Sequence, residues 1–296
     1  RRPPRSTPKP SSAASDVYKR QAIRSMVSFG YNVTGSRLLW YFYSNSDYLI
    51  AGKFLGKTSL GYYSIAFQLA SLPGEKVVSL IGQIIFPYFS KIQDDDMLLQ
   101  NSLFKIVRLV AFIMFPILVG MFLVADCAIP LILSKKWIPA ILPFKILCLI
   151  STLREISPIN FHLAVAKGRP DISFTNMIIC SLVMPLGFLI GSKYGLEGLS
   201  YAWLFLYPIV FLIMTKRSIN VINLSLLQYF KNLTWPVIAT LVMVILVSIF
   251  KHVLINYDYL TQLICLSTIG ALCYVSFVFL FNREVFLEVK SFLRGA

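Results

Sequence analysis

The chain has 296 residues, of which 57% are hydrophobic and only 14% are charged. Soluble globular domains average about 25% charged residues, and a chain of this length has no core large enough to hide so much apolar surface. The net charge of +15 is spread over the connections between apolar runs and forms no basic stripe of the kind that binds nucleic acid. Composition therefore excludes a soluble domain and predicts an integral membrane protein.

Residues 1–21 are rich in Pro, Ser and Arg and contain no apolar run. Such a segment is neither a signal peptide nor a folded domain. Its last seven residues, SDVYKRQ, resemble translated vector or sequencing-adaptor sequence. We expect residues 1–21 to be a non-native or disordered leader, at which the natural chain is truncated.

About eight apolar segments follow, each near the roughly 20 residues that a membrane-spanning helix needs. They lie at 25–52, 59–90, 103–125, 139–166, 172–192, 196–215, 233–250 and 260–281. No alternation of period two appears, which argues against a β-barrel, so the predicted fold is an all-α bundle of about eight transmembrane helices. Prolines within many segments predict kinks.

The distribution of Lys and Arg predicts that both ends of the chain are cytoplasmic. The short, apolar outer connection at 126–138 is compatible with a position in the membrane interface. The tail at 283–296 places apolar side chains on one face, which predicts an interfacial amphipathic helix.

Charge inside a membrane span is costly, so it normally faces a protein interior or a wet cavity. On the first segment, Arg37 and Tyr41 share one helix face, and Asp47 lies about 80° around the helix from Arg37. Asp47 is also about 15 Å further along the axis, so the two charges do not neutralise each other directly. We expect both to serve a lumen; the alternative is an Asp at the headgroups and an Arg paired with a neighbouring helix.

A polar stripe runs along the second segment at intervals of three or four residues: Gln68, Ser71, Glu75, Ser79 and Gln83. Lys76 lies next to it around the helix. This spacing predicts one face that lines a water-filled cavity. The alternative is polar contact between helices without a cavity.

The fourth segment carries a third group of ionisable residues. Ser151, Glu155, Pro158 and His162 fall on one helix face, and Arg154 lies beside Glu155. We expect this face to reach the same lumen. The alternative is an Arg154–Glu155 set satisfied by neighbouring helices, and His162 is expected to be a satisfied interfacial residue.

No signature of an enzyme occurs: GxSxG, P-loop and HExxH motifs are absent. The five cysteines form no CxxC motif, and there are two histidines, so we expect neither a metal site nor a cofactor. The acidic run Asp94-Asp95-Asp96 is expected to cap a helix.

Six pieces of the sequence stand in order between residues 25 and 218: NSDYLIAGKFLG, LGYYSIAFQLASLP, IIFPYFSKIQDD, KKWIPAILPFKILCL, AVAKGRPD and YGLEGLSYAW. Together they resemble the lipopolysaccharide and colanic-acid exporter family (Wzx-type flippases) of the MOP superfamily. No piece is a catalytic motif, but the series is fairly specific. After residue 218 only hydropathy and the number of segments agree.

The resemblance implies a carrier in the bacterial inner membrane that moves undecaprenyl-diphosphate-linked oligosaccharide to the periplasmic leaflet for lipopolysaccharide or capsular polysaccharide and exopolysaccharide biosynthesis. Family members have two six-helix lobes around a cavity, often with two further helices. By analogy, residues 22–218 are the second lobe and 219–282 the further helices. The first lobe is absent, and because alternating access needs two halves, we expect no transport by this chain alone.

The resemblance also places Asp47 at the family's acidic position and Lys53 where the family often has Arg. We hypothesise that the diphosphate and glycan bind in the lumen, where cations anchor phosphate; the residues are Arg37, Tyr41, Gln68, Lys76 and Arg154. Asp47, Glu75 and Glu155 are hypothesised to take up a proton or Na⁺ as the coupling step. The expected partners are the lipid-linked oligosaccharide, membrane lipids, the missing lobe and polysaccharide polymerase machinery, with no nucleic acid.

Three other functions stay open. A MATE-like multidrug or metabolite antiporter of the same superfamily would have a cavity dominated by acidic and aromatic groups. A membrane-embedded polysaccharide polymerase or ligase would need a large periplasmic loop. A structural or assembly subunit would transport nothing. The sequence identifies neither the glycan nor the coupling ion.

Overall fold

The computed structural model describes residues 12–281, apart from the side chains of residues 12–22, 24–25 and 78–80. Every regular element in that range is a helix, which confirms the all-α integral membrane fold. The predicted tail helix at 283–296 lies outside the described residues. The elements are α1 (Ser12–Ile50), the π-helical η1 (Ala51–Leu55), α2 (Gly56–Lys91), α3 (Asp96–Leu133), the 3₁₀ helix η2 (Lys135–Ala140), α4 (Ile141–Arg154), α5 (Ser157–Ala166), α6 (Pro170–Ser192), α7 (Gly195–Ile219), the 3₁₀ helix η3 (Asn220–Ile222), α8 (Leu226–Lys231), α9 (Thr234–Val253) and α10 (Tyr259–Phe281).

Among the described residues, six helical stretches are long and apolar enough to cross a membrane: α3, η2 with α4 and α5, α6, α7 with η3, α9 and α10. A seventh is counted if the bent pair Met26–Val77 and Ile81–Lys91, which turns by 47°, forms one span. The sequence predicted about eight, with 25–52 and 59–90 as separate spans. The count is lower because polar and charged residues lower the mean hydropathy of both segments.

Three boundaries differ from the expectation. α1 begins at Ser12, so residues 12–21, expected to be disordered, are helical; this stretch follows Pro10 and contains neither Gly nor Pro, so nothing in it stops the helix. α3 continues to Leu133 and takes in most of the predicted interfacial connection. The fourth segment divides into α4 and α5 at Glu155, because Pro158 has no N–H with which to continue the helical ladder.

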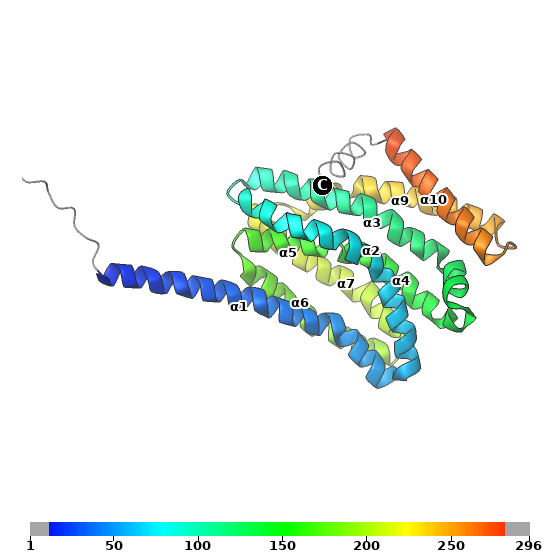
Figure 1. The fold of residues 1–296 in the computed structure, drawn as a ribbon, viewed down its shortest axis with the longest axis horizontal. Helices are drawn as coiled ribbons and strands as arrows, with labels where there is room; N and C mark the ends of the chain where they lie inside the picture. Colours follow the sequence, from blue (N-terminus) through cyan, green and yellow to red (C-terminus); the bar gives the residue numbers. More distant parts are fainter. Residues whose placement is uncertain (1–11, 282–296) are drawn as a thin grey trace, which may run out of the picture.

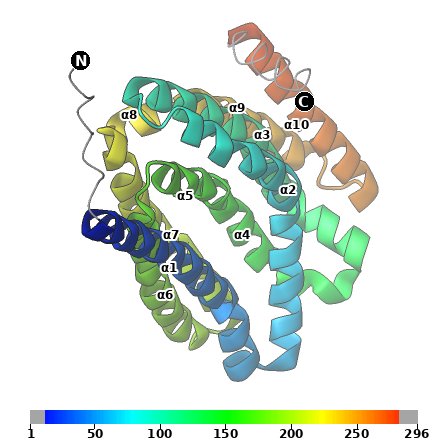
Figure 2. The ribbon, with the colours of Figure 1, turned by 60° about the vertical axis from the view of Figure 1, so that its left-hand side comes forward.

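The helices pack in two groups (Figures 1 and 2). α1 packs against α6, α6 against α7, and α7 against α4 and α5, while α2 packs against α4 and α5 from another side. α1 and α2 diverge from the turn that joins them, and the first turns of α1 project beyond the bundle (Figure 1). α9 and α10 form the second group and pack on each other and on α3.

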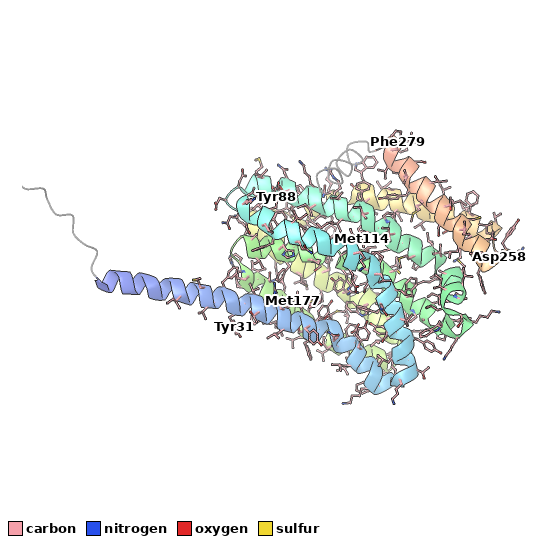
Figure 3. All side chains as sticks on the ribbon, in the orientation of Figure 1. Tyr31, Tyr88, Met114, Met177, Asp258 and Phe279 are labelled. Carbon is pink, nitrogen blue, oxygen red and sulfur yellow. The ribbon has the colours of Figure 1, made fainter. Side chains whose placement is uncertain are left out.

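Ring contacts hold α1 on α6 and connect three helices in the core. Tyr31 of α1, labelled in Figure 3, lies 5.5 Å from Phe174 of α6 between ring centroids. Deeper in the bundle, the indole of Trp203 on α7 is fully buried and packs against Tyr43 of α1, at 5.9 Å, and Phe188 of α6, at 5.1 Å. Large aromatic side chains bury the most apolar area per residue, so this cluster fixes the positions of α1, α6 and α7.

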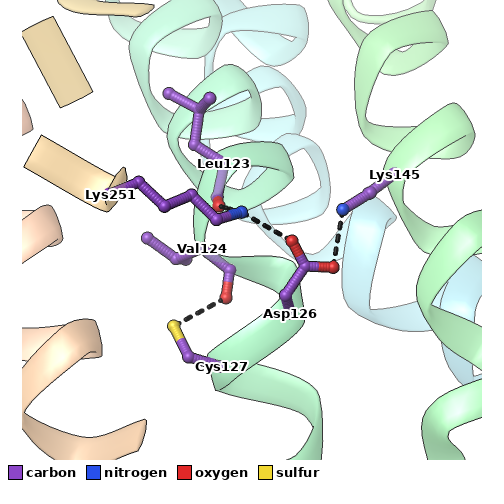
Figure 4. Close-up of polar contacts among 6 residues, drawn as sticks. All are labelled: Leu123, Val124, Asp126, Cys127, Lys145 and Lys251. Carbon is purple, nitrogen blue, oxygen red and sulfur yellow. Dashed lines mark hydrogen bonds and ion pairs between the residues drawn. The ribbon is translucent and has the colours of Figure 1, made fainter. Parts of the chain in front are cut away.

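Three charged side chains join α9 to the larger group of helices; we call Asp126, Lys145 and Lys251 the ion clamp (Figure 4). Lys145 Nζ of α4 lies 2.6 Å from Asp126 Oδ1 of α3, and Lys251 Nζ of α9 lies 2.5 Å from Asp126 Oδ2. Lys251 Nζ also donates to the carbonyl of Leu123, at 3.1 Å. Each carboxylate oxygen therefore has its own ammonium partner from a different helix.

At the opposite end of the bundle, the α2–α3 and α5–α6 connections meet. Asp95 caps α3 by accepting from the N–H of Leu98, at 2.9 Å, which confirms the helix cap expected in the acidic run. Asp96 accepts from Lys167, at 2.8 Å, and the same ammonium donates to the carbonyl of Gln93. These contacts fix the ends of the helices that surround the site.

Candidate functional site

One cavity of about 1100 Å³ lies between the two diverging helices and the helices behind them. Its walls come from α1, α2, α4, α5, α6 and α7, and the rings of Trp40, Tyr48 and Phe67 alternate there with charged and polar groups. The sequence-predicted residues that line it are Arg37, Tyr41, Gln68, Glu75, Arg154 and Glu155. The structure thus brings ionisable groups from three predicted spans into one hollow.

α1 and α2 contribute the exposed side of the cavity. Arg37 and Tyr41 line it from α1, one helical turn apart, and both are exposed. From α2, Gln68 and Glu75 line it together with Ser71 and Gln83, so four members of the predicted stripe share one face; the side chain of Ser79 lies outside the described part of the chain. The period of three to four residues is that of a helix face directed at a common space.

Arg154, the last residue of α4, is held by aromatic rings. Its guanidinium carbon lies 4.6 Å from the ring centroid of Phe67 and 5.0 Å from that of Trp203; we call these two rings the aromatic seat. The planar guanidinium stacks well on such faces, and a cation over a ring is attracted by about 0.5–2 kcal/mol. Among the described residues no carboxylate forms an ion pair with Arg154. Its N–H donors are therefore available to a ligand in the cavity.

Glu155 reaches the cavity because α2 has a glycine opposite it. A Cβ on Gly74 would overlap the carboxylate of Glu155, so a larger residue at this position would require the Glu155 side chain to move. Glu75, one residue after Gly74, lines the same wall and interacts electrostatically with Glu155. Two carboxylates, one from α2 and one from the break between α4 and α5, thus line the same cavity.

Two predicted site residues are not part of the cavity lining. Lys76 is exposed on α2, next to the stripe but outside the cavity wall. Asp47 is fully buried near the end of α1. Its carboxylate accepts from the hydroxyl of Tyr63, at 2.6 Å, and from its neighbour's backbone N–H, at 2.9 Å. Both remain hypotheses as substrate-binding and ion-coupling residues.

Sequence reasoning missed an uncharged polar wall of the cavity. It consists of Asn160 of α5, Ser173 and Asn176 of α6, and Thr215 and Ser218 of α7, all buried. Asn160 donates to Thr215, at 3.2 Å, and Asn176 donates to Ser218, at 3.3 Å. The sequence signal for this wall was weak: Ser173 and Asn176 are three residues apart, as are Thr215 and Ser218, so each pair shares a helix face.

The fold and the cavity together define a class: a multi-pass membrane protein of α-helices with a charged, aromatic-lined cavity. Residues 13–142 match a family model described as polysaccharide biosynthesis protein. Over 229 residues the chain is 27% identical to the teichuronic acid biosynthesis protein TuaB of Bacillus subtilis, covering 77% of this chain and 47% of the relative.

Two further relatives carry related names. The lipopolysaccharide biosynthesis protein WzxC of Escherichia coli is 30% identical over 70% of this chain and 43% of its own length. The succinoglycan biosynthesis transport protein ExoT of Rhizobium meliloti is 22% identical over 94% of this chain and 57% of its own. The chain thus spans about half the length of these curated relatives, and no solved structure matches it. These similarities support the resemblance of the motifs to the Wzx-type flippase family.

Proposed function

We propose that this bundle is one lobe of a transporter that moves undecaprenyl-diphosphate-linked oligosaccharide across the inner membrane during polysaccharide biosynthesis. The observation that carries the proposal is the cavity, in which Arg37 and Arg154 meet aromatic and hydroxyl groups within a membrane bundle. In the proposed division, residues 22–218 form the lobe and residues 219–282 the additional helices. The names of the relatives, which refer to polysaccharide biosynthesis and transport, support this class of substrate.

The cavity offers a distinct contact for each part of such a substrate. Arg37 and Arg154 would bind the diphosphate, because guanidinium forms bidentate hydrogen bonds with phosphate oxygens. Tyr41 and Gln68 would contact sugar rings and hydroxyls. The isoprenoid chain would stay in the bilayer on the open side, where α1 exposes Trp40. Each contact is of a chemical type that the substrate supplies.

Alternating access is proposed to occur against a second lobe on this open side. On the helix face opposite Trp40, α1 also exposes Leu38, Phe42 and Leu49, which suits contact with lipid or with another apolar bundle. Transporters of this kind move two halves about a shared midplane site. Glu75 and Glu155 are proposed to take up the coupling proton or Na⁺, because two carboxylates that line one cavity favour uptake of a cation.

Binding of a short isoprenyl diphosphate tests the proposal. The chain in nanodiscs of zwitterionic lipid is titrated calorimetrically with farnesyl diphosphate, farnesyl monophosphate and farnesol. We expect affinity in that order, and we expect Arg37→Gln to weaken diphosphate binding without affecting farnesol. Equal affinity for the three would contradict the proposal. Tighter binding of tetraphenylphosphonium than of farnesyl diphosphate would favour the antiporter instead.

A further inference from the structure

The most buried polar contacts near the cavity form a chain that starts at Asp47 and ends at Arg154. Tyr63 donates its hydroxyl hydrogen to Asp47 Oδ2, at 2.6 Å. Trp203 Nε1 donates to the same Tyr63 oxygen, at 2.8 Å. The face of Trp203 then forms half of the aromatic seat of Arg154. Three helices, α1, α2 and α7, thus contribute in sequence to the position of one side chain on a fourth.

None of the first three residues is accessible: Asp47, Tyr63 and Trp203 are each 0% exposed. A buried carboxylate without compensation costs several kcal/mol, yet here Asp47 accepts two hydrogen bonds and its charge is held in place. Asp47 and Tyr63 do not line the cavity, so a ligand there cannot touch them directly. Their effect on a ligand must therefore pass through the residue at the end of the chain.

The hydrogen bonds also fix the orientation of the indole. Trp203 has one N–H, and its bond to Tyr63 determines which edge of the ring points toward α2. With that edge fixed, the face of the ring is presented to the guanidinium 5.0 Å away. A guanidinium gains attraction only over the face of a ring. The orientation of Trp203 thus decides whether Arg154 stays in its seat.

We propose that Asp47, Tyr63 and Trp203 are positioning residues that hold the Arg154 guanidinium at the cavity wall with its donors directed at an anionic ligand. This inference deepens the proposed function and rests on it for the identity of the ligand, a diphosphate. It assigns Asp47 a role distinct from ion uptake: the carboxylate anchors the first hydrogen bond. The positioning itself does not depend on which anion binds.

The reactivity of Arg154 tests the positioning without any substrate. Phenylglyoxal modifies accessible guanidinium groups, and peptide mass spectrometry reports each arginine separately. In Tyr63→Phe and Asp47→Leu, we expect Arg154 to leave its seat and to react about three- to tenfold faster relative to Arg37, as loss of one hydrogen bond of about 1 kcal/mol allows. Arg37 lines the same cavity from α1 and is the internal reference.

Tyr62→Phe is the matched control. Tyr62 precedes Tyr63 on α2 and packs against Trp137, at 5.7 Å between centroids, away from the chain of contacts. We expect the Arg154 to Arg37 ratio in this variant to equal that of the native chain. A ratio that stays unchanged in both Tyr63→Phe and Asp47→Leu would overturn the proposal, as would equal changes at all arginines, which would indicate general loosening of the bundle.

Trp203→Phe keeps the test decisive if the other two variants do not fold. Phenylalanine retains a ring for the seat but has no N–H, so the proposal requires faster modification of Arg154 here too, and an unchanged ratio would overturn it. Farnesyl diphosphate binding is then measured on the same samples, with three- to tenfold weaker binding expected. If the native chain binds no diphosphate while the reactivity ratios change, the proposed function fails and the positioning stands.

Discussion

The ion clamp and the aromatic seat hold charged side chains by different contacts: ion pairs in the clamp and aromatic rings in the seat. In the clamp, two ammonium groups meet the two oxygens of Asp126 at 2.5 and 2.6 Å, so the charges are engaged with one another. In the seat, Arg154 lies on two ring faces and forms no ion pair among the described residues. In the ion clamp, the ammonium groups form hydrogen bonds that join helices. In the aromatic seat, the ring contacts use none of the N–H groups of Arg154.

The difference separates structural charge from functional charge within one bundle. A salt bridge stabilises by satisfying both partners, so it leaves little for a ligand. A cation–π contact holds the cation without using its N–H groups. Substitution of Arg154 should therefore weaken ligand binding with little loss of stability, whereas substitution of Asp126 should lower stability with little effect on binding.

The largest effect is expected from Arg154→Met. Methionine keeps an unbranched apolar side chain against the rings but offers no donors, so farnesyl diphosphate binding should weaken by tenfold to more than a hundredfold, since hydrogen bonds to charged groups contribute about 1.5–3 kcal/mol. Calorimetry in nanodiscs measures this. The thermal unfolding midpoint should be unchanged or higher. Arg169→Met, at an exposed loop arginine paired with Asp171, is the control and should bind normally.

Asp126→Ala should lower the stability of the chain and leave ligand binding nearly unchanged. Removal of the carboxylate leaves two ammonium groups facing each other, and we expect a loss of about 1–3 kcal/mol, reduced from the buried limit because the three side chains are partly exposed. Thermal unfolding measures the loss, while farnesyl diphosphate binding should change little. The triple variant Asp126→Asn, Lys145→Met, Lys251→Met removes all three charges and should recover most of the stability. If it is no more stable than Asp126→Ala, the clamp does not act through charge.

Some of these features could be predicted from the sequence and others could not. The cavity face of α2 was predictable, because residues three and four apart share a helix face and Gln68, Ser71 and Glu75 repeat that spacing. Lys76 was predicted for the cavity as well, but it is not part of the cavity lining, although it directly follows the lining residue Glu75. Helical periodicity identifies the face that lines the cavity, but consecutive residues differ by about 100° around the helix, so a residue next to that face can point away from the cavity.

The clamp and the seat were not predictable for a different reason. Lys251 lies 125 residues from Asp126, and Trp203 lies 140 residues from Tyr63. No local pattern encodes a pairing over such a separation; it depends on how whole helices pack. The resemblance identified the segments around Asp47 and Trp203 as familiar, but it did not show that a tyrosine connects them.

Gly74→Ala tests a third charged group, the carboxylate of Glu155, which lies close to α2 at a position where Gly74 has no side chain. The new Cβ would overlap Glu155, so the carboxylate must move or α2 must shift from the break between α4 and α5. Because this carboxylate is the end of a flexible side chain, we expect it to rotate away from Gly74 at a cost of at most about 1 kcal/mol, which thermal unfolding measures as a lower midpoint than that of Gly61→Ala. Gly61→Ala is the control on the same helix, where a Cβ meets nothing within 4 Å; it should be neutral or slightly stabilising. Equal effects of the two would refute the close approach.

The smallest effect is expected at Asp258, an exposed carboxylate in the α9–α10 connection (Figure 3). The hydroxyl and the backbone N–H of Thr261 donate to it, at 2.6 and 3.1 Å, and lower its pKa below the ordinary value. A lowered pKa in the folded chain means that this stabilisation is present above the unfolded pKa of about 3.9 and is lost as the pH falls through the folded value. Between neutral pH and about pH 3, the native midpoint should therefore fall slightly further than that of Asp258→Asn.

Thr261→Val separates the hydroxyl from the backbone contribution to this cap. It should move the pKa of Asp258 back toward its ordinary value, because the N–H bond alone remains. Thr268→Val is the control, since its hydroxyl bonds only to a carbonyl of its own helix, at 2.7 Å. A difference between native and Asp258→Asn as large as that produced by Asp126→Ala would contradict the ranking, because an exposed carboxylate that water can solvate should matter less than one that joins three helices.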